Sequence, residues 1–224
     1  MLTCLFDIDG TLITTGGAGR MALREALTVA FGVAEPTESV PISGRTDRGI
    51  TRDMMLHHGI EPSVENWEKF RDAYFVQLPS VLERFGGRVL PGITSLLETL
   101  AARDDVAVGL LTGNTRKGAS LKLGHFALAS YFEFGGFGDH HLVRDDVAHE
   151  ALQEVRTRFG TRFKPDRLWV IGDTPLDVQC ARAINASVIA VETGTHPHEE
   201  LQACHPDALL ADLSDPRVLQ ILGV

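Results

Sequence analysis

Two aspartates, Asp7 and Asp9, stand on either side of one isoleucine, immediately after an apolar segment near the N-terminus. Two carboxylates at the end of a buried strand repel each other, and loss of water pushes one of them toward its neutral form. A divalent cation removes this conflict, and Mg²⁺ prefers a few carboxylate oxygens together with waters and a substrate phosphate. The pair therefore predicts a metal-assisted reaction at an anionic group.

Two more polar clusters follow apolar segments further along the chain. Thr112, Gly113 and Asn114 follow one such segment, and Asp173 and Asp177 follow another. Ligands of open parallel sheets bind outside the carboxyl ends of the strands, where the loops diverge. We therefore expect these clusters to converge with the first pair. The candidate metal ligands are Asp7, Asp9, Asp173 and Asp177.

This set of residues has the chemistry required for phosphoryl transfer. Asp7 would attack phosphorus to form an aspartyl-phosphate, and Asp9 would protonate the departing alcohol and then activate water. The ion would neutralise the nucleophile and the phosphate together, so that two anions can approach. Thr112, with the backbone N–H groups of Gly113 and Asn114 at the start of the next helix, would hold the phosphate oxygens.

A cation beside the phosphate is still required, and two residues are candidates. Lys122 lies in the apolar run Leu121 to Leu123, on the helix that follows Thr112, where an unpaired ammonium would be costly. Arg144 follows a glycine-rich stretch and could serve instead, as a group that binds the substrate. We favour Lys122 as the catalytic cation on the burial cost and keep Arg144 as the alternative.

The elements that must position these residues alternate along the chain. Short aliphatic segments that lack polar alternation predict buried strands, and helical patterns of apolar residues lie between them. Such alternation is typical of parallel βαβ units in a doubly wound α/β sheet. Strands are predicted at residues 3–8, 106–111, 168–171, 187–191 and, more weakly, 208–210, and helices at 93–102, 116–128, 147–159 and 176–184.

One interval, from about residue 15 to residue 88, contains helical patterns at 21–31, 48–57 and 64–85 but no convincing strand. We interpret it as a helical insertion after the first strand, so that residues 1–15 and 88–224 form the main domain and residues 16–87 a second one. Glycine pairs at both ends are candidate hinges for domain closure. Within the insertion, Arg20 and Arg45 are candidates for binding an anionic substrate, because arginine binds carboxylate or phosphate in a bidentate way.

The composition of the chain limits the classes of partner that we expect. The chain has 224 residues, 44% of them hydrophobic and 23% charged, with a net charge of -9 and no long basic run. A nucleic-acid reader needs clustered Lys and Arg, so nucleic acid is not an expected partner. We also expect no signal peptide and no membrane span. Three widely spaced cysteines fit neither a disulfide framework nor a zinc site, which favours a location in the cytoplasm. We expect the protein to be a monomer or a homodimer.

The three motifs at Asp7 to Leu12, Thr112 to Asn114 and Gly172 to Asp177, in this order, resemble those of the haloacid dehalogenase-like hydrolase superfamily. Within it, the chain looks most like the phosphoglycolate phosphatase group over essentially its whole length. The resemblance implies a Rossmann-like core, a helical cap after the first strand, Mg²⁺ and a phosphoaspartate intermediate. It also implies a cationic motif residue, in many relatives a Lys-Pro after the third core strand, where this chain reads Val143, Arg144 and Asp145.

The second aspartate discriminates among the activities of this superfamily. Relatives that dehalogenate carbon or cleave phosphonates resemble one another in lacking an acid at the position of Asp9, since no alkoxide needs a proton. Asp9 therefore favours phosphoryl transfer. Together with the resemblance, it leads us to expect a Mg²⁺-dependent phosphomonoester hydrolase that acts on a small phosphorylated metabolite, with phosphoglycolate as the first choice. The alternatives are a β-phosphoglucomutase-like phosphomutase and a non-catalytic phosphate-ester sensor, although a sensor needs no proton donor at Asp9.

Overall fold

A six-stranded sheet lies at the centre of the computed structural model, which describes residues 1–224. Every neighbouring pair of its strands is parallel, as the alternation of strands and helices predicts. In order across the sheet, the strands are β5 (Gly135–Gly136), β4 (Val106–Leu111), β1 (Leu2–Phe6), β6 (Leu168–Gly172), β7 (Ser187–Val191) and β8 (Ala208–Leu210). The five predicted strands are confirmed, and β5 is an additional edge strand.

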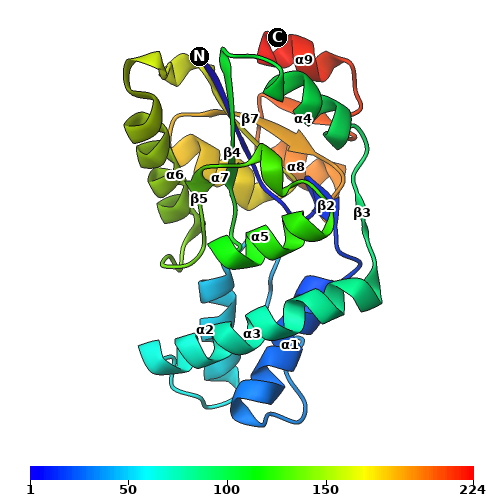
Figure 1. The fold of residues 1–224 in the computed structure, drawn as a ribbon, viewed down its shortest axis with the longest axis vertical. Coiled ribbons are helices and arrows are strands. Elements are labelled where there is room, and N and C mark those ends of the chain that lie inside the picture. Colours follow the sequence, from blue (N-terminus) through cyan, green and yellow to red (C-terminus); the bar gives the residue numbers. More distant parts are fainter.

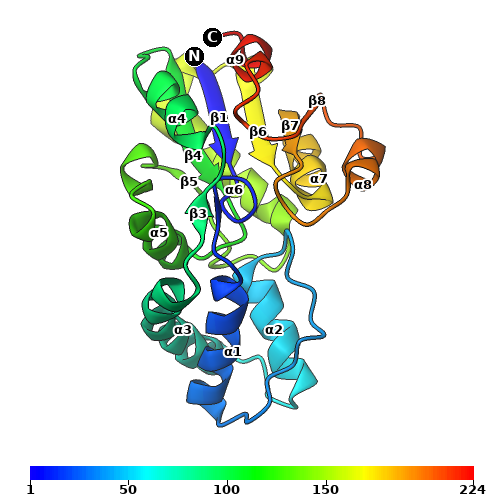
Figure 2. The same cartoon turned by 90° about the vertical axis from the view of Figure 1, so that its right-hand side faces the viewer.

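Helices cover both faces of this sheet, and the predicted doubly wound α/β class is confirmed (Figure 2). One face packs against α4, α5 and α9, and the other against α6 and α7. All five residues of β1 are buried, as expected for a strand that is covered on both sides. The helices of the two layers are α4 (Ile93–Ala101), α5 (Arg116–His125), α6 (Arg144–Phe159), α7 (Pro175–Ala183) and α9 (Arg217–Leu222).

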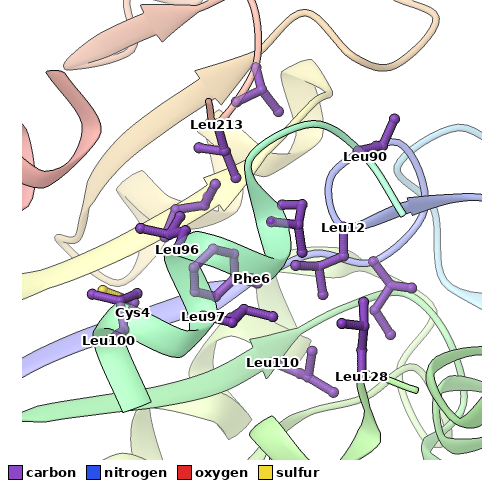
Figure 3. Close-up of a cluster of buried hydrophobic side chains, with 14 of the residues drawn as sticks. Cys4, Phe6, Leu12, Leu90, Leu96, Leu97, Leu100, Leu110, Leu128 and Leu213 are labelled. Atoms are coloured by element: carbon purple, nitrogen blue, oxygen red, sulfur yellow. The ribbon is translucent and has the colours of Figure 1, made fainter. Parts of the chain in front are cut away.

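The packing of α4 on β1 shows how the apolar spacing of a helix fits the strand beneath it. Leu97 and Leu100 of α4 lie against Phe6 and Cys4 of β1 (Figure 3). Side chains alternate across a strand, so Cys4 and Phe6 face this layer while Leu5 belongs to the opposite one. The core therefore holds β1 from both faces up to Phe6, and Asp7 follows at its carboxyl end.

Residues 16–87, which we call the cap, contain three helices with an apolar cluster of their own. They are α1 (Ala18–Phe31), α2 (Asp47–His57) and α3 (Val64–Phe85), in agreement with the three helical patterns of the sequence. Before and after the cap, the chain forms the short antiparallel pair β2 (Ile13–Thr14) and β3 (Arg88–Val89). Figure 1 shows the cap at the end of the molecule opposite the two termini.

Short elements complete the chain. They are α8 (His198–Ala203) and three single turns of 3₁₀ helix, at Ala129–Tyr131, Gly160–Arg162 and Pro165–Arg167. None of the helices is both long and apolar enough to cross a membrane. The carboxyl ends of β1 and β6 point toward the cap (Figure 2), so the polar motifs that follow them lie between the sheet and the cap.

The apolar cluster of the cap gives a testable difference between two positions of α3. Leu78 is 0% exposed and Val76 is 72% exposed. We expect Leu78→Ala to lower the free energy of unfolding by about 2–5 kcal/mol, because it opens a cavity. We expect the control Val76→Ala to change it by less than about 0.5 kcal/mol. Urea unfolding followed by circular dichroism measures both, and equal effects would contradict the packing of α3 in this cluster.

Candidate active site

Three loops meet at the carboxyl edge of the sheet because β1 lies between β4 and β6. Asp7 follows β1, residues 112–114 follow β4, and Asp173 follows β6. After β1, the chain adds β4 and β5 on one side of β1 and then β6, β7 and β8 on the other. The direction in which strands are added to the sheet therefore changes at β1. Such a point is where open α/β sheets bind ligands. The structure thus brings together the polar clusters that the sequence singles out.

The carboxylates of Asp7, Asp173 and Asp177 are buried and lie within 4.8 Å of one another. Burial raises the pKa of Asp7 to about 6, against the lowering effect of Arg144. Burial also raises the pKa of Asp173 well above its usual range, and the negative charge of Asp177 raises it further. The group therefore requires additional positive charge in order to ionise fully at neutral pH.

The surroundings of Asp173 fit a divalent cation. Asp173 Oδ1 accepts a hydrogen bond from Thr11 Oγ1 at 2.9 Å. A Cβ added at Gly10 or Gly194 would lie 2.3 Å or 1.8 Å from Asp173 Oδ2, so only glycine at these two positions lets the carboxylate take its place. Hard carboxylate oxygens are the ligands that Mg²⁺ prefers. Asp7 and Asp173 are thus the residues best placed to hold the ion.

Asp177 is committed to protein partners. Its Oδ2 atom accepts hydrogen bonds from the backbone N and the Oγ1 atom of Thr174, at 2.9 and 2.7 Å, in a capping box at the start of α7. Its Oδ1 atom lies 2.5 Å from Arg144 Nη2. Asp177 therefore borders the acidic group while it holds a helix end and an arginine in place.

Arg144, the first residue of α6, is buried and reaches back to the nucleophile candidate. Its Nη2 atom lies 2.9 Å from Asp7 Oδ1 and also donates to the carbonyl oxygen of Leu111 at 3.2 Å. Its Nη1 atom donates to the carbonyl oxygen of Gly44 in the cap at 3.1 Å. Burial opposes its charge, but Asp177 and Asp7 more than offset this and raise the pKa of Arg144 well above its usual range.

Lys122, on α5, serves the other aspartate. Its Nζ atom donates to Asp9 Oδ2 and to Asn114 Oδ1, both at 2.6 Å, and the residue is buried. Asn114 Nδ2 donates to Asp9 Oδ2 at 2.8 Å and to Thr112 Oγ1 at 2.9 Å. The two candidate cations therefore do not compete for one place, because Arg144 pairs with Asp7 and Lys122 with Asp9.

A cleft of about 770 Å³ separates these residues from the cap, and both candidate arginines of the cap line it. Arg45 is occupied, because its Nη2 atom lies 2.6 Å from Asp53 Oδ2 and its Nη1 atom donates to the carbonyl oxygen of Pro41 at 3.0 Å. Arg20 makes only one long hydrogen bond, of 3.5 Å, to the carbonyl oxygen of Glu38. Of these two arginines, Arg20 is therefore the one without an acidic partner.

The cleft also contains residues that the sequence did not single out. Tyr74 lies in a cap helix whose pattern is that of any amphipathic helix, so no sequence signal marks it. Asp47 is the first residue of α2, two positions after Arg45, and the sequence does not predict that it is buried. His196, whose Nε2 atom lies 3.0 Å from Ser43 Oγ, follows β7 and meets the cap only through tertiary structure.

Comparison with known proteins agrees with this geometry. The sequence model of the haloacid dehalogenase-like hydrolase family matches residues 4–182. A phosphoglycolate phosphatase of Synechococcus elongatus is 27% identical to this chain, over 96% of the chain and 95% of its own length. A probable pseudouridine-5'-phosphatase of Saccharomyces cerevisiae is 28% identical, over 93% of the chain and 88% of its own length. The crystal structure of CbbY from Rhodobacter sphaeroides in complex with phosphate is 18% identical, covers 100% of both chains and superposes with a TM-score of 0.78.

The raised pKa values of Asp7 and Asp173 predict how a metal would stabilise the protein. A carboxyl with a raised pKa keeps its proton in the folded state at pH values where the unfolded chain has lost it. Stability therefore falls as the pH rises, between about pH 4 and 6 for Asp7, and Asp173 acts in the same direction. Below the folded-state pKa values, Mg²⁺ must displace these protons before it can bind. We expect Mg²⁺ at a hundred times its Kd to raise Tm by roughly 5–10 °C at about pH 7.5, and by much less at about pH 5.

Differential scanning fluorimetry at constant ionic strength measures this shift. Asp173→Asn should remove most of it, whereas the exposed control Asp104→Asn should retain it. An equal shift in both variants would place the ion elsewhere.

Proposed function

Because the chain belongs to the haloacid dehalogenase-like hydrolases, we propose that it is a Mg²⁺-dependent phosphomonoester hydrolase. Its substrate is a small phosphorylated metabolite, with phosphoglycolate as the first choice, and its intermediate is an aspartyl-phosphate on Asp7. The observation that carries the proposal is the environment of Asp7, a buried carboxylate beside Asp173 with one oxygen paired to Arg144. The similarity to a phosphoglycolate phosphatase along nearly the whole chain supports the choice of substrate.

Asp7 is oriented for attack by the ion pair at one of its two oxygens. Arg144 Nη2 holds Oδ1 at 2.9 Å, and no protein hydrogen bond reaches Oδ2, which can approach phosphorus. Arg144 also neutralises charge at the place where a phosphate must enter, so we assign it the role of the motif cation. Bound Mg²⁺ would neutralise the nucleophile and the phosphate together, held by Asp7 and Asp173.

Asp9 is placed for proton transfer at the leaving group. Lys122 Nζ and Asn114 Nδ2 both donate to its Oδ2 atom, at 2.6 and 2.8 Å, which fixes the side chain and leaves Oδ1 for the substrate. The side chain is 40% exposed and lines the cleft, so a leaving oxygen can reach it. Asp9 donates a proton to the alcohol in the first step and takes one from water in the second.

The loop after β4 would hold the transferred phosphate. Gly113 and Asn114 line the cleft, and Thr112 lies behind them, fully buried, with its Oγ1 atom bound to Asn114.

On the cap, Arg20 would bind an anionic group of the substrate, because it is free of an acidic partner whereas Arg45 is paired with Asp53.

The role of Asp7 is tested by its amide variant. We expect Asp7→Asn to lower kcat by at least about a thousandfold, because the amide cannot form the acyl-phosphate. The control Asp104→Asn, at an exposed position, should keep full activity. Phosphate release from phosphoglycolate with Mg²⁺, and after chelation of the metal, measures both the nucleophile and the metal requirement. Full activity in Asp7→Asn would contradict this mechanism.

The assignment of Arg20 is tested by comparing two substrates. We expect Arg20→Ala to lower kcat/KM for phosphoglycolate about 10- to 100-fold, because a charge-assisted hydrogen bond is lost. The loss should be less than about threefold for p-nitrophenyl phosphate, which has no second anionic group. Arg45→Ala is the matched control and should change the ratio of the two substrates little. A reversed result would assign the anion to Arg45.

A further inference from the structure

Asp47, the first residue of α2, connects the cap to the loop after β4 through two hydrogen bonds. Its backbone N donates to the carbonyl oxygen of Gly113 at 2.7 Å. Its Oδ2 atom accepts from the backbone N of Thr115 at 2.8 Å. One cap residue therefore spans the loop that presents Gly113 and Asn114 to the cleft.

The Thr115 N–H group depends on this carboxylate. Thr115 is the N-cap of α5, so its N–H precedes the hydrogen-bond ladder of that helix. Its side chain is used inside the helix, where Oγ1 accepts from the backbone N of Gly118 at 3.2 Å. Thr115 is fully buried, and the Asp47 carboxylate is the acceptor that its N–H group has in the structure.

Glycines allow the cap loop and the core to approach closely around this contact. A Cβ added at Gly113 would lie 2.0 Å from the carbonyl oxygen of Arg45. A Cβ added at Gly44 would lie 2.6 Å from Thr174 Oγ1 on the core. Both positions lack room for a methyl group, so residues 44–47 are seated against the core on two sides.

A carboxylate is a costly group at this position. Asp47 is only 8% exposed, and burial raises its pKa to about 6, against the lowering effect of the Lys122 charge. An acid at the first position of a surface helix gains from the helix dipole without burial. The buried location of Asp47 therefore indicates a function beyond helix stability. The positive charge nearby is that of Lys122, which pairs with Asp9.

We propose that Asp47 is a positioning residue that holds the loop of residues 112–115, from the cap, in the conformation that phosphoryl transfer requires. This inference rests on the proposed phosphatase function. Asp47 bonds to Gly113 and Thr115, on either side of Asn114, and acts through Asn114, whose side chain contacts both Asp9 and Lys122. Its loss displaces groups that orient the proton donor, so the effect falls on kcat more than on KM.

Steady-state kinetics of two variants test the proposal, with Asp72, an exposed acid of the cap helix α3, as the control. Asp47→Ala should lower kcat about 10- to 100-fold with KM within about threefold. Asp47→Asn keeps an oxygen for the Thr115 N–H and should restore kcat to within about fivefold of the wild type. Asp72→Ala should change neither constant. Wild-type kcat in Asp47→Ala, or equal losses in Asp47→Ala and Asp47→Asn, would overturn the proposal.

Two measurements without turnover separate this role from a general loss of structure. The Thr115 amide should exchange slowly with solvent in the wild type and in Asp47→Asn, and faster in Asp47→Ala, as followed by NMR. Fluoroberyllate with Mg²⁺ should still be captured at Asp7 in Asp47→Ala, which shows an intact core. Slow exchange of Thr115 in Asp47→Ala would overturn the contact itself.

The wild-type protein distinguishes this proposal from the proposed function. A wild type that neither releases phosphate nor captures fluoroberyllate overturns the phosphatase function, and the positioning role with it. An active wild type together with an equally active Asp47→Ala overturns the role of Asp47 alone.

Discussion

Three carboxylates, those of Asp7, Asp173 and Asp177, lie within 4.8 Å of one another at an edge of the sheet where side chains exclude most water. At that distance, each ionised pair repels by roughly 3–4 kcal/mol for an effective dielectric constant of about 20. Arg144 offsets part of this by pairing with two of them. Asp173 has no arginine or lysine partner, which is why a divalent ion fits beside it.

The same need for charge balance explains why the site contains two buried cations. Arg144 pairs with Asp7, the nucleophile that we propose, and Lys122 pairs with Asp9 and is 5% exposed at its side chain. Each is costly to bury alone and becomes favourable only with its own carboxylate. Because the pairs are separate, attack and proton transfer can depend on different cations. From the sequence alone, Lys122 and Arg144 are alternatives, because one phosphate requires one cation beside it.

Most of the fold is predictable from the sequence because its parallel strands are short aliphatic runs that are buried on both faces. The exceptions have local physical reasons. The strand β5 consists of Gly135 and Gly136, which carry no apolar pattern. The helix α6 begins at Arg144, before its first apolar residue, because Asp145 and Asp146 favour a helix N-terminus.

The convergence of the acidic motifs was equally predictable, since parallel strands end at one edge of the sheet. The partners of these residues were not, because they depend on side chains that reach across elements. Arg144 extends from a helix start to Asp7, and Asp47 extends from the cap to Thr115. Residue type and spacing along the chain do not predict which side chains make such contacts between elements.

The cap loop connects these separate charges. Gly44 accepts a hydrogen bond from the arginine that holds Asp7, Asp47 binds the loop whose asparagine holds Asp9, and Ser43 meets His196 beyond β7. The same few residues of the cap are therefore linked to Asp7 through Arg144, to Asp9 through the loop of Asn114, and to one wall of the cleft through His196. A cap that moves away would release these contacts together and admit water to the buried charges. Seating of the cap and assembly of the proposed site are thus parts of one event, because the hydrogen bonds that hold the cap in place also reach Arg144 and the loop after β4.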